Sequence, residues 1–187
     1  SVSLRRAIQS ASIVLASTPE TRELLLRMGV PAAYVRLAPA AFIHSDRIEL
    51  FKATRPKTRG ACLRIFAGGN LEGRKGLALA LKTLASLKER GVPFEFIFGG
   101  YGPELRHMRQ LANRLSLDEG RVIFRPSLPL EEYRQILQMS NVYLLPSLRE
   151  SGGLTLGEAM LAGCVPVVIK AGGPGLLVTS ECGYAFA

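Results

Sequence analysis

The stretch from Pro146 to Glu158 has the residue types and spacing that most clearly suggest chemistry in this 187-residue sequence. Two carboxylates, Glu150 and Glu158, enclose Gly152 and Gly153, with seven residues between the carboxylates. Glycines at a helix start let backbone N–H groups approach an anion, and the helix adds positive potential there. Carboxylates accept hydrogen bonds from hydroxyls. The stretch therefore predicts an anion site that is flanked by two hydroxyl-binding carboxylates.

Glu158 also has a purely structural interpretation. Thr155 and Glu158 have the spacing of a capping box, in which the threonine hydroxyl caps a helix and the glutamate returns a hydrogen bond. We expect Glu158 in the first turn of a helix and Glu150 in the loop before it, so both interpretations of Glu158 stay open. Glu150 has no comparable structural role.

A second glycine-rich loop runs from Gly68 to Gly76, again between an expected strand and an expected helix. Its glycines could hold an anion, and Arg74 and Lys75 add two full positive charges. Gly68 and Gly73 have P-loop spacing, but Arg74 stands where that motif has Lys, and no Ser or Thr follows Lys75 to hold magnesium. Phosphate binding is the preferred interpretation, and a plain loop is the alternative.

Two further loops follow expected strands. The loop 99–104 begins like a dinucleotide fingerprint, but Leu105 stands where another glycine would be, so a tight turn explains it equally well. The loop 170–175 is expected to be flexible. It could close over a ligand or be only a turn.

The sequence offers no obvious metal site. Its only aspartates, Asp46 and Asp118, are far apart, so a magnesium site of the Asp-x-Asp type cannot be built, and a diphosphate would be neutralised by Arg74, Lys75 and helix N-termini. The scattered cysteines exclude a disulfide framework and a Cys-x-x-Cys zinc site, and two histidines do not make a His-rich centre. These cysteines and histidines are Cys62, Cys164, Cys182, His44 and His107.

Regular alternation of strands and helices must position these loops. Apolar runs rich in Val, Ile, Leu and Phe predict strands at 62–67, 94–98, 121–124, 142–146 and 165–169. Helices are expected at 76–90, 103–117, 130–139 and 154–163, with Gly91, Gly120 and Gly163 at or just past helix ends. This order predicts an α/β fold: a Rossmann-like parallel sheet with helices on both faces, binding ligands outside the carboxyl ends of its strands.

The first 60 residues do not show the regular alternation of strands and helices that follows them. A strand at 12–16, a helix from about Ser17 to Gly29 and a strand at 34–38 make a βαβ piece too small to bury its own faces. Ser17 is the expected cap of that helix, with Glu20 three residues later. The charged segment 43–60 has no clear pattern and is interpreted as a linker.

Composition sets the wider limits. Hydrophobic residues make up 48% and charged residues 21%, which is enough for a buried core, and no run reaches the roughly 18 apolar residues of a membrane span. The net charge of +9 suggests a polyanionic partner, and residues 1–70 carry most of it with 11 basic and 4 acidic residues. No aromatic residues interleave with the basic stretch 52–64 as a single-strand binder would need, so a solvated linker is favoured over a membrane or nucleic-acid patch.

These features together resemble the C-terminal part of a retaining glycosyltransferase of family four, which has the two-domain GT-B architecture. The paired-glutamate motif is the most specific part of the resemblance. The pieces that carry it are Gly73-Arg74-Lys75-Gly76, Gly100-Tyr101-Gly102-Pro103, and 141–147 running into the motif at 150–168.

The resemblance implies a division of the chain and roles for its residues. Residues 1–43 would be a remnant of the N-terminal domain, 44–60 the linker, and 61–187 a nucleotide-sugar donor domain truncated at its C-terminus. Lys75 and Arg74 would bind the diphosphate, Glu150 would be the catalytic residue that contacts the donor sugar, Glu158 would accept from the ribose, and 124–128 would lie against the base. The other implied substrate-binding residues are Gly69, Asn70, Gly100, Gly102, Arg125, Ser151, Gly152, Gly153, Leu154 and Thr155, of which 152–155 would hold the distal phosphate through their backbone.

The resemblance also implies an activity. The complete enzyme, of hexosyltransferase type, would transfer a sugar from a UDP or GDP donor to an acceptor hydroxyl with retention of configuration and without an obligatory metal or cofactor, whereas this piece alone would be inactive. Its partners would be the nucleotide sugar, its own N-terminal domain and an anionic membrane touched peripherally, but no nucleic acid, at a cytoplasmic location or the cytoplasmic face of the membrane. The alternatives are an epimerase-like enzyme acting on sugar nucleotides, and a non-catalytic module for nucleotide-sugar binding or membrane docking.

Overall fold

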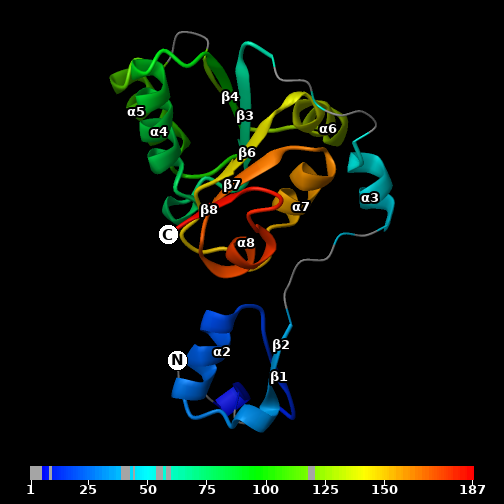
Figure 1. The fold of residues 1–187 in the computed structure, drawn as a ribbon. Coiled ribbons are helices and arrows are strands. Elements are labelled where there is room, and N and C mark those ends of the chain that lie inside the picture. Colours follow the sequence, from blue (N-terminus) through cyan, green and yellow to red (C-terminus); the bar gives the residue numbers. More distant parts are fainter. Residues whose placement is uncertain are drawn as a thin grey trace.

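A computed structural model of the chain describes residues 6–8, 10–38, 43, 45–53, 57, 60–117 and 121–187. Figure 1 shows a small N-terminal βαβ unit and a larger α/β unit that carries the rest of the described chain. The larger unit contains every glycine-rich loop singled out in the sequence.

The small unit is a short parallel pair of strands joined by a helix. β1 pairs in parallel with β2, and α2 packs its Leu25 against the strands. A hydroxyl caps α2, as expected: Thr18 Oγ1 accepts from the backbone N–H of Thr21 at 3.2 Å. Because Thr18 is the cap, the capping-box spacing of Ser17 and Glu20 is not used. The elements are β1 (Val14–Ala16), α2 (Pro19–Arg27), the 3-10 turn η1 (Ala32–Tyr34) and β2 (Val35–Leu37).

Within the described residues of the larger unit, six parallel strands form one sheet in the order β5-β4-β3-β6-β7-β8. The order reverses between β3 and β6, and in such sheets the crevice outside the carboxyl ends of those two strands is the usual ligand site. The strands are β3 (Leu63–Gly68), β4 (Phe94–Gly99), β5 (Val122–Arg125), β6 (Val142–Leu145), β7 (Val165–Ile169) and β8 (Tyr184–Phe186).

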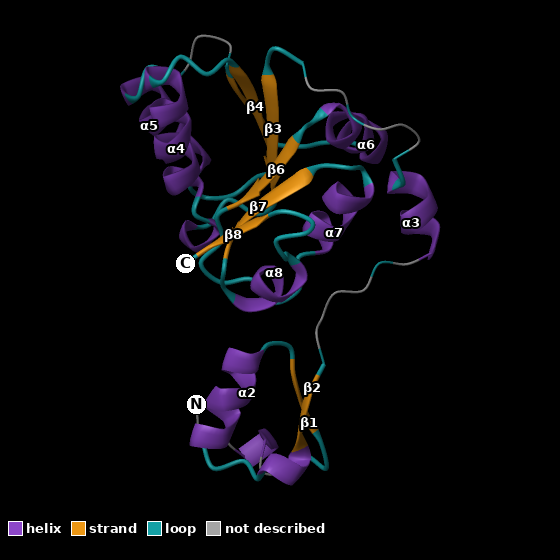
Figure 2. Cartoon of the chain, viewed as in Figure 1, coloured by secondary structure: helices purple, strands orange, loops and turns teal. Residues whose placement is uncertain are grey.

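Helices cover both faces of this sheet (Figure 2). Successive strand residues point to opposite faces, so Ile65 packs with α4 and α5 whereas Phe66 packs with α3, α6 and α7. The predicted Rossmann-like α/β fold is therefore confirmed. The helices are α3 (Ser45–Phe51), the 3-10 turn η2 (Gly73–Lys75), α4 (Leu77–Glu89), α5 (Leu105–Arg114), α6 (Leu130–Met139), α7 (Leu154–Leu161) and α8 (Gly172–Leu177).

The short elements differ from the sequence prediction. The loop at 170–175, expected to be flexible, begins the short helix α8, and β8 extends the sheet beyond β7. Gly91 and Gly163 adopt left-handed backbone just past α4 and α7, as expected, whereas Gly120 lies outside the described residues.

The described part of the expected linker lies along α7 instead of being solvated. Phe51 on α3 is fully buried, and the backbone N–H of Ala53 donates to Leu161 O at 2.8 Å. Lys57 Nζ then donates to Leu137 O at 2.6 Å and lies 3.2 Å from Cys164 Sγ. Charge hid this packing from the sequence, because one buried aromatic in a seven-residue helix sets up no visible period. The proposed domain boundaries themselves stay predictions.

Candidate functional site

The loops after β3 and β6 meet at the switch point of the sheet. The backbone N–H of Leu148 donates to Arg74 O at 2.8 Å, and Arg74 Nη1 donates to Arg149 O at 3.2 Å. Gly76 has a φ of +67°, and a Cβ on it would overlap Pro146 O. Only glycine therefore permits this approach, which brings together the two loops that the sequence singled out.

An ion pair joins these loops. Lys75 Nζ donates to Glu150 Oε2, and both side chains are only 16% exposed. Arg74, beside Lys75, pairs with Glu72 Oε2 at 2.8 Å on the solvent side. A cation suited to a phosphate and a carboxylate suited to hydroxyls are thus in direct contact, although 75 residues separate them in sequence.

The start of α7 leaves its backbone donors available. Gly153 is the N-cap with a φ of +80°, and within the described residues no side chain caps the helix. The capping-box interpretation was wrong, because Glu158 lies one residue beyond the first turn and Thr155 Oγ1 instead accepts from Tyr143 Oη at 2.7 Å. The N–H groups after Gly152 therefore have the geometry of an anion site.

Glu158 is a buried carboxylate with two partners. It is 8% exposed, and its Oε2 accepts from Tyr133 Oη at 2.8 Å. Its Oε1 lies 3.5 Å from Arg47 Nη1 on α3. Burial raises the pKa of the hydroxyls of Tyr133 and Tyr143 above the usual range, so both keep their protons and act as donors.

A cleft of about 890 Å³ is lined by residues of the small unit and by the loops after β3, β6 and β7 of the larger one. Gly172, with a φ of +59°, lies against Glu150 O so closely that a Cβ would overlap it, and Gly173 N–H donates to the same oxygen at 3.0 Å. The loop after β7 thereby fixes Glu150 at the cleft wall. The lining residues are Ser17, Thr18, Glu20, Thr21, Leu24, Arg74, Leu148, Arg149, Glu150, Ser151, Lys170, Ala171 and Gly172.

Residues 56–187, well over half of the chain, match the family profile described as "Glycosyl transferases group 1". The chain belongs to this family. The larger unit is accordingly a Rossmann-like domain of a GT-B glycosyltransferase, and the small βαβ unit precedes it in the chain. An epimerase-like enzyme, the alternative from sequence, has no support from this match.

Individual relatives agree with the family. YqgM of Bacillus subtilis strain 168, an uncharacterized glycosyltransferase, is 34% identical over 109 residues, which cover 58% of this chain and 30% of YqgM. The amylovoran biosynthesis glycosyltransferase AmsK of Erwinia amylovora is 30% identical over 155 residues, covering 77% of this chain and 35% of AmsK. The chain thus spans about a third of the length of these curated relatives.

A solved structure shares the fold. The crystal structure of Anabaena Alr3699/HepE in complex with UDP-glucose superposes with a TM-score of 0.79 at 21% identity, covering 100% of this chain and 52% of that one. At this identity the likeness establishes the fold of the glycosyltransferase domain.

The remaining predicted site residues of this glycosyltransferase domain lie at the ends of β3, β4 and β5. Gly69 N–H donates to Gly99 O at 3.0 Å, and Gly100 N–H donates to Arg125 O at 2.9 Å, so the three strand ends are joined through the backbone. The Arg125 side chain is directed to Glu132 on α6. The others, Asn70, Gly102, Ser151 and Leu154, lie in the loops after β3, β4 and β6 and at the start of α7.

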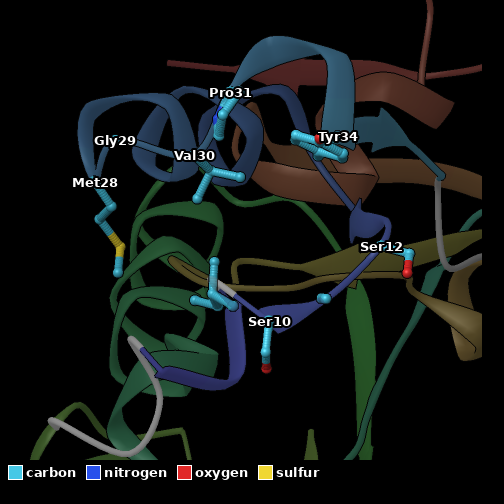
Figure 3. A pocket seen from close by; sticks show the side chains of 9 residues that line it. Ser10, Ser12, Met28, Gly29, Val30, Pro31 and Tyr34 are labelled. Atoms are coloured by element: carbon cyan, nitrogen blue, oxygen red, sulfur yellow. The ribbon is translucent and has the colours of Figure 1, made fainter.

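A second cavity, of about 410 Å³, lies in the small unit (Figure 3). Apolar and hydroxyl side chains line it, and none of its lining residues is charged, so it lacks the cations that a diphosphate needs. The lining residues are Ile8, Ser10, Ala11, Ser12, Met28, Gly29, Val30, Pro31 and Tyr34.

Metal-ligand clusters and membrane-spanning helices are both absent from the described residues. No group of three or more His, Cys, Asp or Glu side chains in this part of the chain comes together as a metal site. Of the helices that the structure describes, none is long and apolar enough to cross a membrane.

Sequence reasoning missed the partners of Glu158. Tyr133 lies among polar residues on α6, and Arg47 lies in the segment interpreted as a linker. Arg47 and Phe51 share one face of α3 at a spacing of four residues, and that apolar-and-basic pair is the only local signal that could have pointed to a packed helix.

Proposed function

We propose that this chain is the donor-binding part of an enzyme that transfers a sugar from a nucleoside diphosphate to an acceptor hydroxyl with retention of configuration. The observation that carries the proposal is the contact between Lys75 and Glu150 at the switch point, where Glu150 also lines the cleft. A nucleotide sugar offers a diphosphate beside sugar hydroxyls, which are the groups that these two side chains would bind.

The diphosphate would lie between Lys75 and the start of α7. Lys75 and Arg74 supply positive charge, and the N–H groups of 152–155 supply uncharged donors along the helix dipole. These groups would stabilise the negative charge that develops on the leaving diphosphate as the acceptor hydroxyl attacks, which is an electrostatic form of catalysis. No metal would be required.

Binding of the diphosphate would replace Glu150 as the partner of Lys75. Without a ligand, Glu150 neutralises Lys75 in a part-buried setting. A phosphate oxygen that takes over the Lys75 ammonium leaves the Glu150 carboxylate free to accept from hydroxyls of the donor sugar. Glu158 would accept from the ribose hydroxyls, and the segment 124–128 would lie against the base.

The proposal extends to the donor, the acceptor and the location of the complete protein. HepE was solved with UDP-glucose, so a uridine diphosphate sugar is the first candidate donor, with a guanosine diphosphate sugar as the alternative. The acceptor would enter the cleft from the side of α2, and the parts that complete the relatives would be needed for transfer. A cytoplasmic location, with basic residues touching an anionic membrane face, fits the net charge of +9.

The test is a thermal-shift panel of UDP, GDP, ADP and their sugar conjugates, followed by calorimetry of Lys75→Ala. A ligand at 100 times its dissociation constant stabilises a protein by about 2.7 kcal/mol, so the correct base will stand out. Lys75→Ala should lower the affinity for the nucleoside diphosphate by about ten- to a hundredfold, because hydrogen bonds to charged groups contribute about 1.5–3 kcal/mol. The affinity for the nucleoside should be unchanged. Lys82→Ala removes an exposed lysine on α4 and is the matched control.

If Lys75→Ala lowers the affinities for the diphosphate and the nucleoside equally, the lysine acts through folding. The net charge of +9 supports a second candidate function, a non-catalytic module that docks on anionic membranes. Salt-dependent binding to phosphatidylserine vesicles, with no nucleotide in the panel bound, would favour that module.

A further inference from the structure

Glu158 and three neighbouring side chains form a closed ring of contacts, here named the Glu158 cluster. Arg47 lies 3.5 Å from Glu158 Oε1, and its guanidinium stands over the ring of Phe51 with 5.6 Å to the centroid. Phe51 meets the ring of Tyr133 edge-on at 5.4 Å, and Tyr133 donates to Glu158 Oε2 at 2.8 Å. The ring joins α3, α6 and α7, so each residue is held from both sides.

The two polar contacts leave Glu158 with unused acceptor capacity. An ionised carboxylate has about four acceptor positions, and Tyr133 occupies one of them on Oε2. Arg47 is placed for charge attraction only: among the described residues its buried Nη1 has no hydrogen-bond partner. Oε1 therefore stands beside a positive charge without giving up a hydrogen-bond position.

The partly buried Tyr133 and the fully buried Tyr143 donate their hydrogen bonds to different groups. Tyr143 gives its hydrogen bond to Thr155, at the start of α7, whereas Tyr133 gives its hydrogen bond to the carboxylate itself. Because Tyr133 is clamped between Phe51 and Phe66, whose ring lies 5.8 Å away, its hydroxyl has a fixed place. The carboxylate plane of Glu158 is therefore set by an aromatic residue that is itself held by the segment before β3.

We propose that Arg47 and Tyr133 are positioning residues for ribose recognition, which orient Glu158 so that Oε1 accepts from a ribose hydroxyl. The proposal rests on the proposed function. It makes α3, which the sequence suggested was part of a linker, a component of the nucleotide site. Its consequence is selectivity: the cluster adds affinity only for a ligand that carries ribose hydroxyls.

The experiment measures that selectivity by calorimetry with UDP and 2′,3′-dideoxy-UDP, or with the guanosine or adenosine pair if the panel selects that base. Glu158→Gln should lower the preference for the ribonucleotide by about tenfold. Tyr133→Phe and Arg47→Met should each lower it about three- to tenfold, by weakening the ribonucleotide and leaving the dideoxynucleotide unchanged. Arg47→Lys, which keeps the charge, should recover part of the preference.

Two matched controls separate positioning from folding. Tyr143→Phe deletes a tyrosine hydroxyl that donates to Thr155 rather than to Glu158, and Arg134→Met deletes an arginine of α6 that pairs with Glu131. Both should keep the preference, and melting curves of all variants report any loss of folding.

The outcomes separate the positioning role of Arg47 and Tyr133 from the proposed function of the chain. If Tyr133→Phe and Arg47→Met weaken both nucleotides equally, or change neither, the positioning role is overturned while the proposed function stands. If Glu158→Gln leaves the preference intact, the ribose role of Glu158 fails and the positioning role fails with it. If neither nucleotide binds, the proposed function itself is wrong.

Discussion

Glu150 is held on two sides before any ligand arrives. Its carboxylate pairs with Lys75, and its backbone oxygen accepts from Gly173 N–H. The backbone contact remains when a diphosphate takes over Lys75, so the released carboxylate can reach a bound sugar from a backbone that is already fixed, at little further entropic cost. The residue therefore fits a role in sugar recognition better than a role in binding the nucleotide.

Glu150→Gln should separate those two roles. We expect the variant to bind the plain nucleoside diphosphate as well as the parent chain, or slightly better because Lys75 is no longer neutralised. It should lose the extra affinity that the sugar contributes, by about tenfold if one charge-assisted hydrogen bond is lost. Calorimetry with UDP and UDP-glucose measures both numbers. An unchanged affinity for UDP-glucose would mean that Glu150 does not bind the sugar.

Among the helices and strands, α3 illustrates how a short element can be essential to a site. Its seven residues bury Phe51 completely while Ile48 remains 38% exposed. Since α3 packs on α6 and α7, its loss would loosen the helices that carry Tyr133 and Glu158. The element is too short to be stable without those contacts.

Phe51→Ala should therefore destabilise the chain by about 3–5 kcal/mol, the usual cost of truncating a buried aromatic. Ile48→Ala, on the same helix, should cost less than about 1 kcal/mol. Urea unfolding of both variants makes the comparison. Similar small losses would mean that α3 detaches from α7 in solution, which would contradict its place in the Glu158 cluster.

The sequence predicted the elements whose patterns are local. The strands β3, β4, β6 and β7 lie inside the sheet and β5 at its edge, and all five carry enough apolar residues to appear as apolar runs. Gly91 and Gly163 end helices as expected. The site loops could be found because a parallel sheet with a known strand order brings strand ends together. Tyr133 and Arg47 could not, because their roles depend on contacts between α3, α6 and α7, which no local period encodes.

For the whole molecule, positive charge around the cleft replaces a metal in our proposal. Nucleotide binding should then survive EDTA, because Lys75, Arg74 and the start of α7 supply the neutralising charge. Calorimetry of UDP with and without EDTA should give the same affinity. A collapse of affinity on chelation, with recovery on adding magnesium or manganese, would contradict this charge balance.

The small unit has a further consequence for the behaviour of the chain in solution. Ile13, just before β1, and Leu15 on β1 are 59% and 66% exposed, so the unit presents a small apolar patch beside a strand edge. Colloidal stability then depends on mutual repulsion between chains of net charge +9. Because added salt screens that repulsion but leaves the patch unchanged, raising the ionic strength will lower the solubility of this protein.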